Sequence, residues 1–207
     1  RLLVRVPPHC EILTMREIAV LPDPRGAFEQ ALSAPIGSPP LSEIVRAKGK
    51  PASEVTAAVT VSDITRPVPY RGENGLLRPL LDRLEACGIL RKNIRIVVGN
   101  GMHRPSTPEE RAEMFGDEIL RDYRVTDHDC EDLASLDFIG RSETGGDVFV
   151  NSAFYRADLR IATGLVESHY MVGLSGGRKA ICPASWISEP SRSSTAPRFW
   201  NPPSRRT

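Results

Sequence analysis

The sequence predicts an α/β fold in which a mainly parallel sheet is flanked by helices. Short β-branched runs alternate along the chain with segments whose apolar residues recur at helical spacing. A polar segment rich in glycine or proline follows directly after each of the three main predicted strands. Together these observations indicate a Rossmann-like sheet whose active-site loops lie at the carboxyl ends of its strands.

Composition narrows the class of protein. The chain has 207 residues, of which 40% are hydrophobic and 26% charged, enough for one sizeable core. Its net charge of +1 argues against a dedicated nucleic-acid surface, and we expect no membrane span because no apolar run approaches about 18 residues. The four cysteines form no C-x-x-C pair, which fits reduced thiols and a cytoplasmic location.

Three apolar runs predict the central strands, at residues 56–61, 94–98 and 158–163. Each is short and rich in valine, isoleucine, threonine or alanine, as expected for strands covered on both faces. Weaker strands are expected at 2–6, 123–126 and 147–151, the last in a hairpin with the Gly145-Gly146 turn.

Helical spacing predicts the crossover elements. Residues 73–87 carry leucines at intervals of three and four and stop at Gly88, and 41–48 stops at Gly49. A shorter helix is expected at 28–32. Thr107-Pro-Glu-Glu110 reads as a capping box that opens another helix. The acidic run Asp127-His-Asp-Cys-Glu-Asp132 is interpreted as a solvated connection rather than a metal site.

The polar segments after the three main strands supply the candidate site. They are Ser62-Asp-Ile-Thr-Arg-Pro67, Gly99-Asn-Gly-Met-His-Arg-Pro-Ser-Thr107 and the stretch from Gly164 to Pro183. Because neighbouring parallel strands end at the same edge of a sheet, we expect one cleft to collect their functional side chains. These are Asp63, Thr65, Arg66, His103, Arg104, His169 and Lys179.

Such a cleft suits a small anionic substrate. Arg66 or Arg104 can hold a carboxylate in a fork, and a neutral imidazole of His103 or His169 can accept a proton. Two histidines on opposite sides of a chiral centre are what a racemase or epimerase requires. The plainer interpretation is that each histidine is structural and that Asp63 caps its own turn; Asp63 is equally suited to orienting an imidazole.

The third segment contains a loop of bare backbone. Gly173, Gly176 and Gly177 leave main-chain N–H groups open to an anion, and Arg178 and Lys179 add two cations. A glycine turn with two solvated cations is the alternative interpretation. The loop lacks P-loop spacing, and the chain has no G-x-S-x-G elbow, which disfavours nucleotide triphosphatases and hydrolases.

These motifs resemble the nickel-pincer lactate racemase family over most of residues 20–184. The matching strings are Ser-Asp-x-Thr-Arg-Pro at 62–67, Gly-x-His-Arg-Pro-x-Thr at 101–107 and Ser-His-Tyr-x-x-Gly-x-Ser-Gly-Gly-Arg-Lys at 168–179. The resemblance implies a 2-hydroxy acid substrate such as lactate and a nickel-pincer pyridinium mononucleotide, supplied by cofactor-synthesis enzymes and tethered covalently to Lys179. It also leaves a homo-oligomer open.

The resemblance further assigns roles to individual residues. His103 and His169 match the paired acid/base histidines, which move the hydroxyl proton while hydride passes between substrate and cofactor. Arg66 matches the residue that binds the substrate carboxylate, with Asp63 and Thr65 beside it. The cofactor is expected to contact Ser175, Gly176, Gly177, Arg178 and Lys179.

The chain departs from the family pattern after Pro183. The family continues into a Phe-His-Gly segment whose histidine binds nickel, and then into a closing domain, whereas residues 185–207 are rich in Ser, Pro and Arg. Thr195 stands where the family histidine is expected, so no metal ligand is expected in this chain. We therefore expect a catalytic domain over 1–184, a disordered or frame-shifted tail over 185–207, no C-terminal domain, and little or no activity.

Two alternatives remain open at this stage. One is a domain of the same fold that binds carboxylates at Arg66 and Arg104 without chemistry. The other is a cofactor-free epimerase that uses the two histidines alone.

Overall fold

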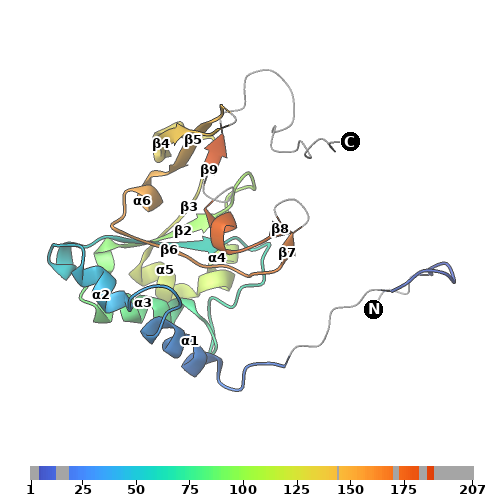
Figure 1. Ribbon diagram of the computed structural model, residues 1–207, viewed down its shortest axis with the longest axis horizontal. Helices are drawn as coiled ribbons and strands as arrows, with labels where there is room; N and C mark the ends of the chain where they lie inside the picture. Colours follow the sequence, from blue (N-terminus) through green and yellow to red (C-terminus); the bar gives the residue numbers. More distant parts are fainter. Residues whose placement is uncertain (1–4, 13–18, 144, 170–172, 182–185, 189–207) are drawn as a thin grey trace.

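The computed structural model describes residues 5–12, 19–143, 145–169, 173–181 and 186–188. Of residues 186–188 it describes the backbone only. Its centre is a four-stranded sheet of β1 (Ala57–Ser62), β2 (Ile94–Gly99), β3 (Arg124–Asp127) and β6 (Leu159–Ala162). The strand order is β3-β2-β1-β6, and every neighbouring pair is parallel. The predicted α/β class with a mainly parallel sheet is confirmed (Figure 1).

The strands form where the chain offers apolar residues to both faces of the sheet. In β1, Val59 is paired with Ile96 of β2 on one side and Ile161 of β6 on the other. Its neighbours Ala58 and Thr60 point to the opposite face and are also buried. This two-sided burial is typical of parallel strands between helical layers.

Five helices belong to the larger core. They are α1 (Pro24–Ser33), α2 (Leu41–Arg46), α3 (Leu77–Ala86), α4 (Pro108–Phe115) and α5 (Asp117–Asp122). In α3 the four residues Leu77, Leu80, Leu81 and Leu84 are each at most 3% exposed, and each such burial contributes about 1.5–3 kcal/mol. The helix starts at Leu77 rather than at the predicted Glu73, because residues 70–76 form a turn in which Gly75 donates to Gly72.

A second, smaller layer covers the other face of the parallel sheet. It contains β4 (Leu136–Arg141), β5 (Asp147–Asn151), β9 (Trp186–Ser188) and the short helix α6 (Ser152–Tyr155). Ala58 of β1 packs there with Val150, Phe154 and Ala157. The predicted hairpin at 147–151 is confirmed. β9 lies beyond the expected domain boundary at 184, whereas residues 189–207, including Thr195, fall outside the described part of the chain.

The remaining elements are short. β7 (Ser168–His169) pairs with β8 (Gly173–Leu174), and 3-10 turns occur at η1 (Ala52–Glu54), η2 (Arg91–Asn93), η3 (Leu133–Ser135) and η4 (Gly177–Ala180). Of the edge strand expected at 2–6, residues 5 and 6 are irregular and 2–4 are outside the described residues. Within the described ranges, no helix is long and apolar enough to cross a membrane.

Candidate active site at the carboxyl ends of the strands

The candidate site lies where the sheet order reverses. β1 has β2 on one side and β6 on the other, so the loops that leave β1 and β6 diverge at their carboxyl ends, which is where ligands bind in open α/β sheets. The buried phenol of Tyr70 spans this point. Its Oη accepts the Ser62 N–H at 2.6 Å and lies 3.3 Å from Thr163 Oγ1, which donates to the Thr60 carbonyl.

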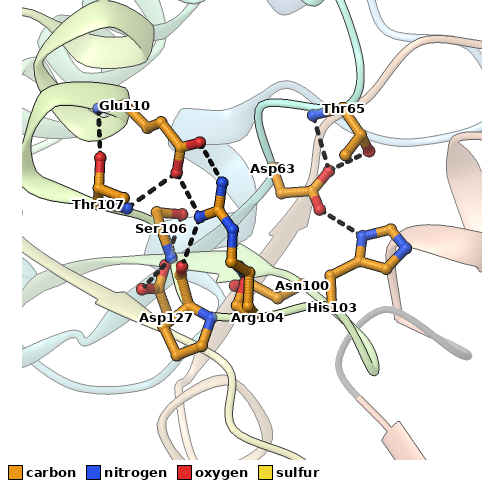
Figure 2. A network of polar contacts seen from close by, with 10 residues as sticks. Asp63, Thr65, Asn100, His103, Arg104, Ser106, Thr107, Glu110 and Asp127 are labelled. Atoms are coloured by element: carbon orange, nitrogen blue, oxygen red, sulfur yellow. Dashed lines mark hydrogen bonds and ion pairs between the residues drawn. The ribbon is translucent and has the colours of Figure 1, made fainter.

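Asp63 joins the first two motif segments. Its Oδ2 lies 2.5 Å from Nδ1 of His103, and its Oδ1 accepts from the backbone N–H and the hydroxyl of Thr65 at 3.2 and 2.5 Å (Figure 2). An ionised carboxylate only accepts hydrogen bonds, so Nδ1 is the donor, and in the neutral imidazole Nε2 is the nitrogen with the lone pair. Asp63 therefore does both things that the sequence left open: it caps its turn and it orients an imidazole.

Two cations share this end of the sheet with Asp63. Arg66 Nε lies 3.6 Å from Oε1 of Glu167, and its Nη1 donates to the Thr65 carbonyl at 3.3 Å. Burial lowers the pKa of the Lys179 ammonium, and the positive charge of Arg66 lowers it further, while Asp63 and Glu167 act in the opposite direction. Charged residues that follow β1, as well as one from its own loop, thus act on the pKa of Lys179.

The loop from 164 to 176 is closed on itself by Ser175. This residue is 4% exposed; its hydroxyl donates to the Leu165 carbonyl at 2.6 Å and accepts the Glu167 N–H at 3.1 Å. Its own N–H donates to the Glu167 carbonyl at 2.9 Å. The hydroxyl that was expected to contact a cofactor is therefore engaged in holding the loop, and a cofactor contact at Ser175 stays a prediction.

Glycine is required where this loop passes the strand ends. Gly176 has φ +67°, and a Cβ there would lie 2.9 Å from the Leu165 carbonyl oxygen. A Cβ on Gly164 would lie 3.3 Å from the Cα of Gly176 and 3.5 Å from Ser62 Oγ. The cation-bearing turn η4 is thus packed directly against the carboxyl end of β1. Gly177, with φ +49°, has open space where a side chain would project.

The loop after β2 is held by α4. Arg104 forms a two-pronged ion pair with Glu110 at 2.5 and 2.8 Å, and this lowers the pKa of Glu110 to about 2 (Figure 2). The idea that Arg104 forks a substrate carboxylate is therefore wrong for this conformation, since its guanidinium already holds one. Arg66 is left as the arginine for that role.

The acidic run 127–132 is not a solvated connection at its start, because Asp127 is the last residue of β3. The Asp127 side chain is 7% exposed and accepts from the N–H and hydroxyl of Ser106 and from Arg111 Nη2. His128 is 2% exposed, and burial lowers the pKa of its imidazole. Sequence reasoning missed Asp127, Tyr70 and Glu167. The only signal was the place of Asp127 at a strand end and of Glu167 inside a motif.

The remaining site predictions are placed but not tested. His169 is half-buried on β7, in register with Gly173, and Arg178 is exposed at the start of η4. That the imidazoles of His103 and His169 face one another stays a prediction. No group of three potential metal ligands occurs among the residues that the structure describes.

Comparison with known proteins identifies the relatives of this chain. The family described as the lactate racemase N-terminal domain matches residues 2–189. The lactate racemase of Lactiplantibacillus plantarum is 35% identical over 179 residues, which cover 86% of this chain and 40% of that protein. The lactate racemase of Thermoanaerobacterium thermosaccharolyticum is 34% identical over 155 residues, or 75% of this chain and 34% of that protein.

A solved structure carries the same fold. The lactate racemase apoprotein from Thermoanaerobacterium thermosaccharolyticum superposes with a TM-score of 0.68 at 29% identity, covering 81% of this chain and 41% of that one. The chain thus spans about 40% of the length of the relatives it matches. It belongs to the lactate racemase family, in the part that corresponds to the N-terminal domain.

Proposed function

We propose that this chain is the cofactor-bearing part of a racemase for small 2-hydroxy acids such as lactate. The observation that carries the proposal is the position of Asp63, which bonds His103 and also acts on the charge of Lys179. Arg66 acts on Lys179 as well. We therefore assign a base, a carboxylate-binding cation and a half-buried amine to one proposed pocket at the end of β1.

His103 acts as the base on one side of the substrate. Asp63 keeps the proton on Nδ1, so Nε2 accepts the hydroxyl proton and later returns it. The negative charge of Asp63 stabilises the imidazolium that forms in between. His169 serves the substrate of opposite hand from the other side of the pocket, which makes the reaction reversible between enantiomers.

Arg66 binds the substrate carboxylate. Its backbone neighbour Thr65 is fixed by Asp63, and its Nη1 is steadied by the Thr65 carbonyl, so the guanidinium is oriented before substrate arrives. The contact with Glu167 is long, at 3.6 Å, and both side chains are partly exposed. A substrate carboxylate can therefore replace Glu167 at little cost.

Lys179 is suited to carry the nickel-pincer nucleotide. A lysine whose pKa is lowered by burial and by a nearby arginine has more of its amine in the neutral, nucleophilic form needed for a covalent tether. The exposed cation of Arg178 and the open backbone at Gly177 suit the phosphate of the nucleotide. When held there, the nickel-pincer group would supply a reversible hydride acceptor for the substrate carbon.

No group of three potential metal ligands occurs among the described residues. The matched relatives are longer than the part that aligns with this chain, and we propose that turnover needs what their remaining length provides, so that these 207 residues alone do not racemise lactate. Enzymes that synthesise the cofactor are the expected partners, and a homo-oligomer is compatible with the site. The free thiols of Cys10, Cys87 and Cys130 fit a cytoplasmic location.

The tether is tested by expressing the chain with the cofactor-synthesis enzymes. Whole-protein and peptide mass spectrometry should show an adduct on the peptide that contains Lys179, together with nickel in the purified protein. The adduct should vanish in Lys179→Arg and persist in Lys92→Arg, the matched exchange at an exposed lysine. A clean apo mass in the parent chain would remove the tether from the proposal.

Isotope tracing separates the alternatives. With the chain joined to the part of a relative that it does not match, inversion of lactate without solvent deuterium at its chiral carbon supports hydride transfer. Inversion with deuterium uptake, without nickel, would indicate an epimerase that uses the histidines alone. A rise in melting temperature with lactate and no inversion would indicate a carboxylate-binding domain.

A further inference from the structure

The loop that carries His103 has little apolar anchorage of its own. Met102 is 84% exposed, and the His103 side chain is 59% exposed. Polar contacts must therefore fix the position of the loop between Asn100 and Thr107. Within the loop the His103 N–H donates to the Asn100 carbonyl at 2.9 Å, and Asn100 Nδ2 donates to the Arg104 carbonyl at 3.1 Å. These bonds close residues 100–104 into a turn.

Asp127 ties that turn to the sheet. Its two carboxylate oxygens accept from Ser106 N–H at 3.0 Å and Ser106 Oγ at 3.1 Å (Figure 2). Arg111 from α4 donates to Oδ2 at 2.5 Å. With 7% of the side chain exposed, these charge-assisted bonds are shielded from water. The ion pair of Arg104 is nearby but its guanidinium is 65% exposed, so it contributes less.

We infer that Asp127 is a positioning residue for His103. It anchors the loop at Ser106, and the closed turn transmits that fixed point to the imidazole that bonds Asp63. Asp127 touches neither substrate nor cofactor in this scheme. The inference rests on the proposed function only in the use that it gives His103.

A matched control exists at the opposite ends of the strands, their amino ends. The Asp158 carboxylate accepts from the N–H and hydroxyl of Thr56 at 2.8 and 2.7 Å, and Lys50 closes on it at 2.7 Å. Its chemistry repeats that of Asp127: one residue's amide and hydroxyl plus one cation. Since it lies at the amino ends of β1 and β6, its loss destabilises the fold without touching the His103 loop.

The test is the tautomer of His103 in the apo chain, read from imidazole ¹⁵N shifts at alkaline pH, where the rings are neutral. His103→Gln assigns the signal among the four histidines. The parent chain and Asp158→Asn should show the Nδ1–H tautomer that Asp63 imposes. Asp127→Asn should lose it in favour of Nε2–H, and faster amide exchange over residues 100–107 should accompany the loss.

Each other outcome is decisive. If Asp127→Asn keeps the Nδ1–H tautomer, or if Asp158→Asn loses it equally, Asp127 has no special role in positioning. Absence of this tautomer in the parent chain would contradict the proposed use of the Asp63 and His103 pair, and the inference would fall with it. Should Asp127→Asn not fold, Ser106→Ala removes one of the two bonds and should produce a partial shift; an unchanged tautomer there would overturn the inference.

Discussion

At the scale of single residues, the charges around Lys179 predict how its pKa should respond to a substitution. The lowered pKa of its ammonium comes first from burial and then from the charge of Arg66, against which Asp63 and Glu167 act. Arg66→Met removes the opposing cation and leaves both carboxylates. The pKa of Lys179 should therefore rise, and its neutral form should appear only at higher pH.

Amine labelling across a pH series measures this shift. The yield of acylated Lys179 peptide is normalised to that of the peptide with exposed Lys92. Its increase with pH should begin at a higher pH in Arg66→Met than in the parent chain. Arg95→Met, an exposed exchange on β2, serves as the charge-matched control and should leave the profile in place. A profile that moves to lower pH in Arg66→Met would mean that Arg66 does not depress the pKa of this amine.

At the scale of elements, α4 positions the His103 loop through its first turn. Thr107 Oγ1 accepts the Glu110 N–H at 3.2 Å, and Glu110 Oε2 accepts the Thr107 N–H at 2.9 Å, which completes the capping box that the sequence predicts. Thr107→Ala should lower the free energy of unfolding by about 1 kcal/mol, because an N–H of the helix start loses its partner. Urea unfolding measures the loss.

Thr107→Ser is the matched control, since it keeps the capping oxygen. It should retain most of the stability that Thr107→Ala loses. Equal losses in the two variants would assign the effect to the Thr107 methyl group rather than to the cap. Because Glu110 also holds Arg104, only the alanine variant should loosen residues 100–107 in amide exchange.

The elements also show what could be predicted from sequence. β1 and β2 were predictable because β-branched runs buried on both faces stand out, and α4 because its capping box is local. Asp127 was misread because its partners Ser106 and Arg111 arrive through tertiary packing, which spacing does not encode. β9 was missed for a similar reason: it pairs with β5 across more than thirty residues of chain.

At the scale of the whole molecule, the carboxyl ends and the amino ends of the parallel strands have different roles. The carboxyl ends of the strands gather Asp63, His103 and Lys179, to which the proposed function gives roles in catalysis and cofactor binding. At the amino ends, the Asp158 carboxylate is likewise bound by backbone and side-chain donors and by a cation. No candidate catalytic residue is adjacent to Asp158 in the chain. Substitutions at the amino ends should therefore change stability alone, which makes those ends the reference for every test of the site.

Asp158→Asn should lower the free energy of unfolding by about 1–3 kcal/mol at neutral pH, the range for hydrogen bonds to charged groups. Lys50 first, and then Thr56, hold the pKa of the Asp158 carboxyl well below its usual range. A depressed carboxyl pKa adds stability that is complete above the unfolded-state value of about 3.9 and is lost as pH falls through the folded value. Urea unfolding from neutral pH into acid should therefore show that the parent chain's advantage in free energy of unfolding over Asp158→Asn shrinks below the unfolded-state pKa.

Lys50→Met, which removes the largest cause of the pKa shift but keeps the carboxylate, should show the same trend with a smaller amplitude. An advantage that stays constant into acid would mean that Asp158 titrates alike in the folded and unfolded chain, and the amino ends would then be held by packing rather than by charge.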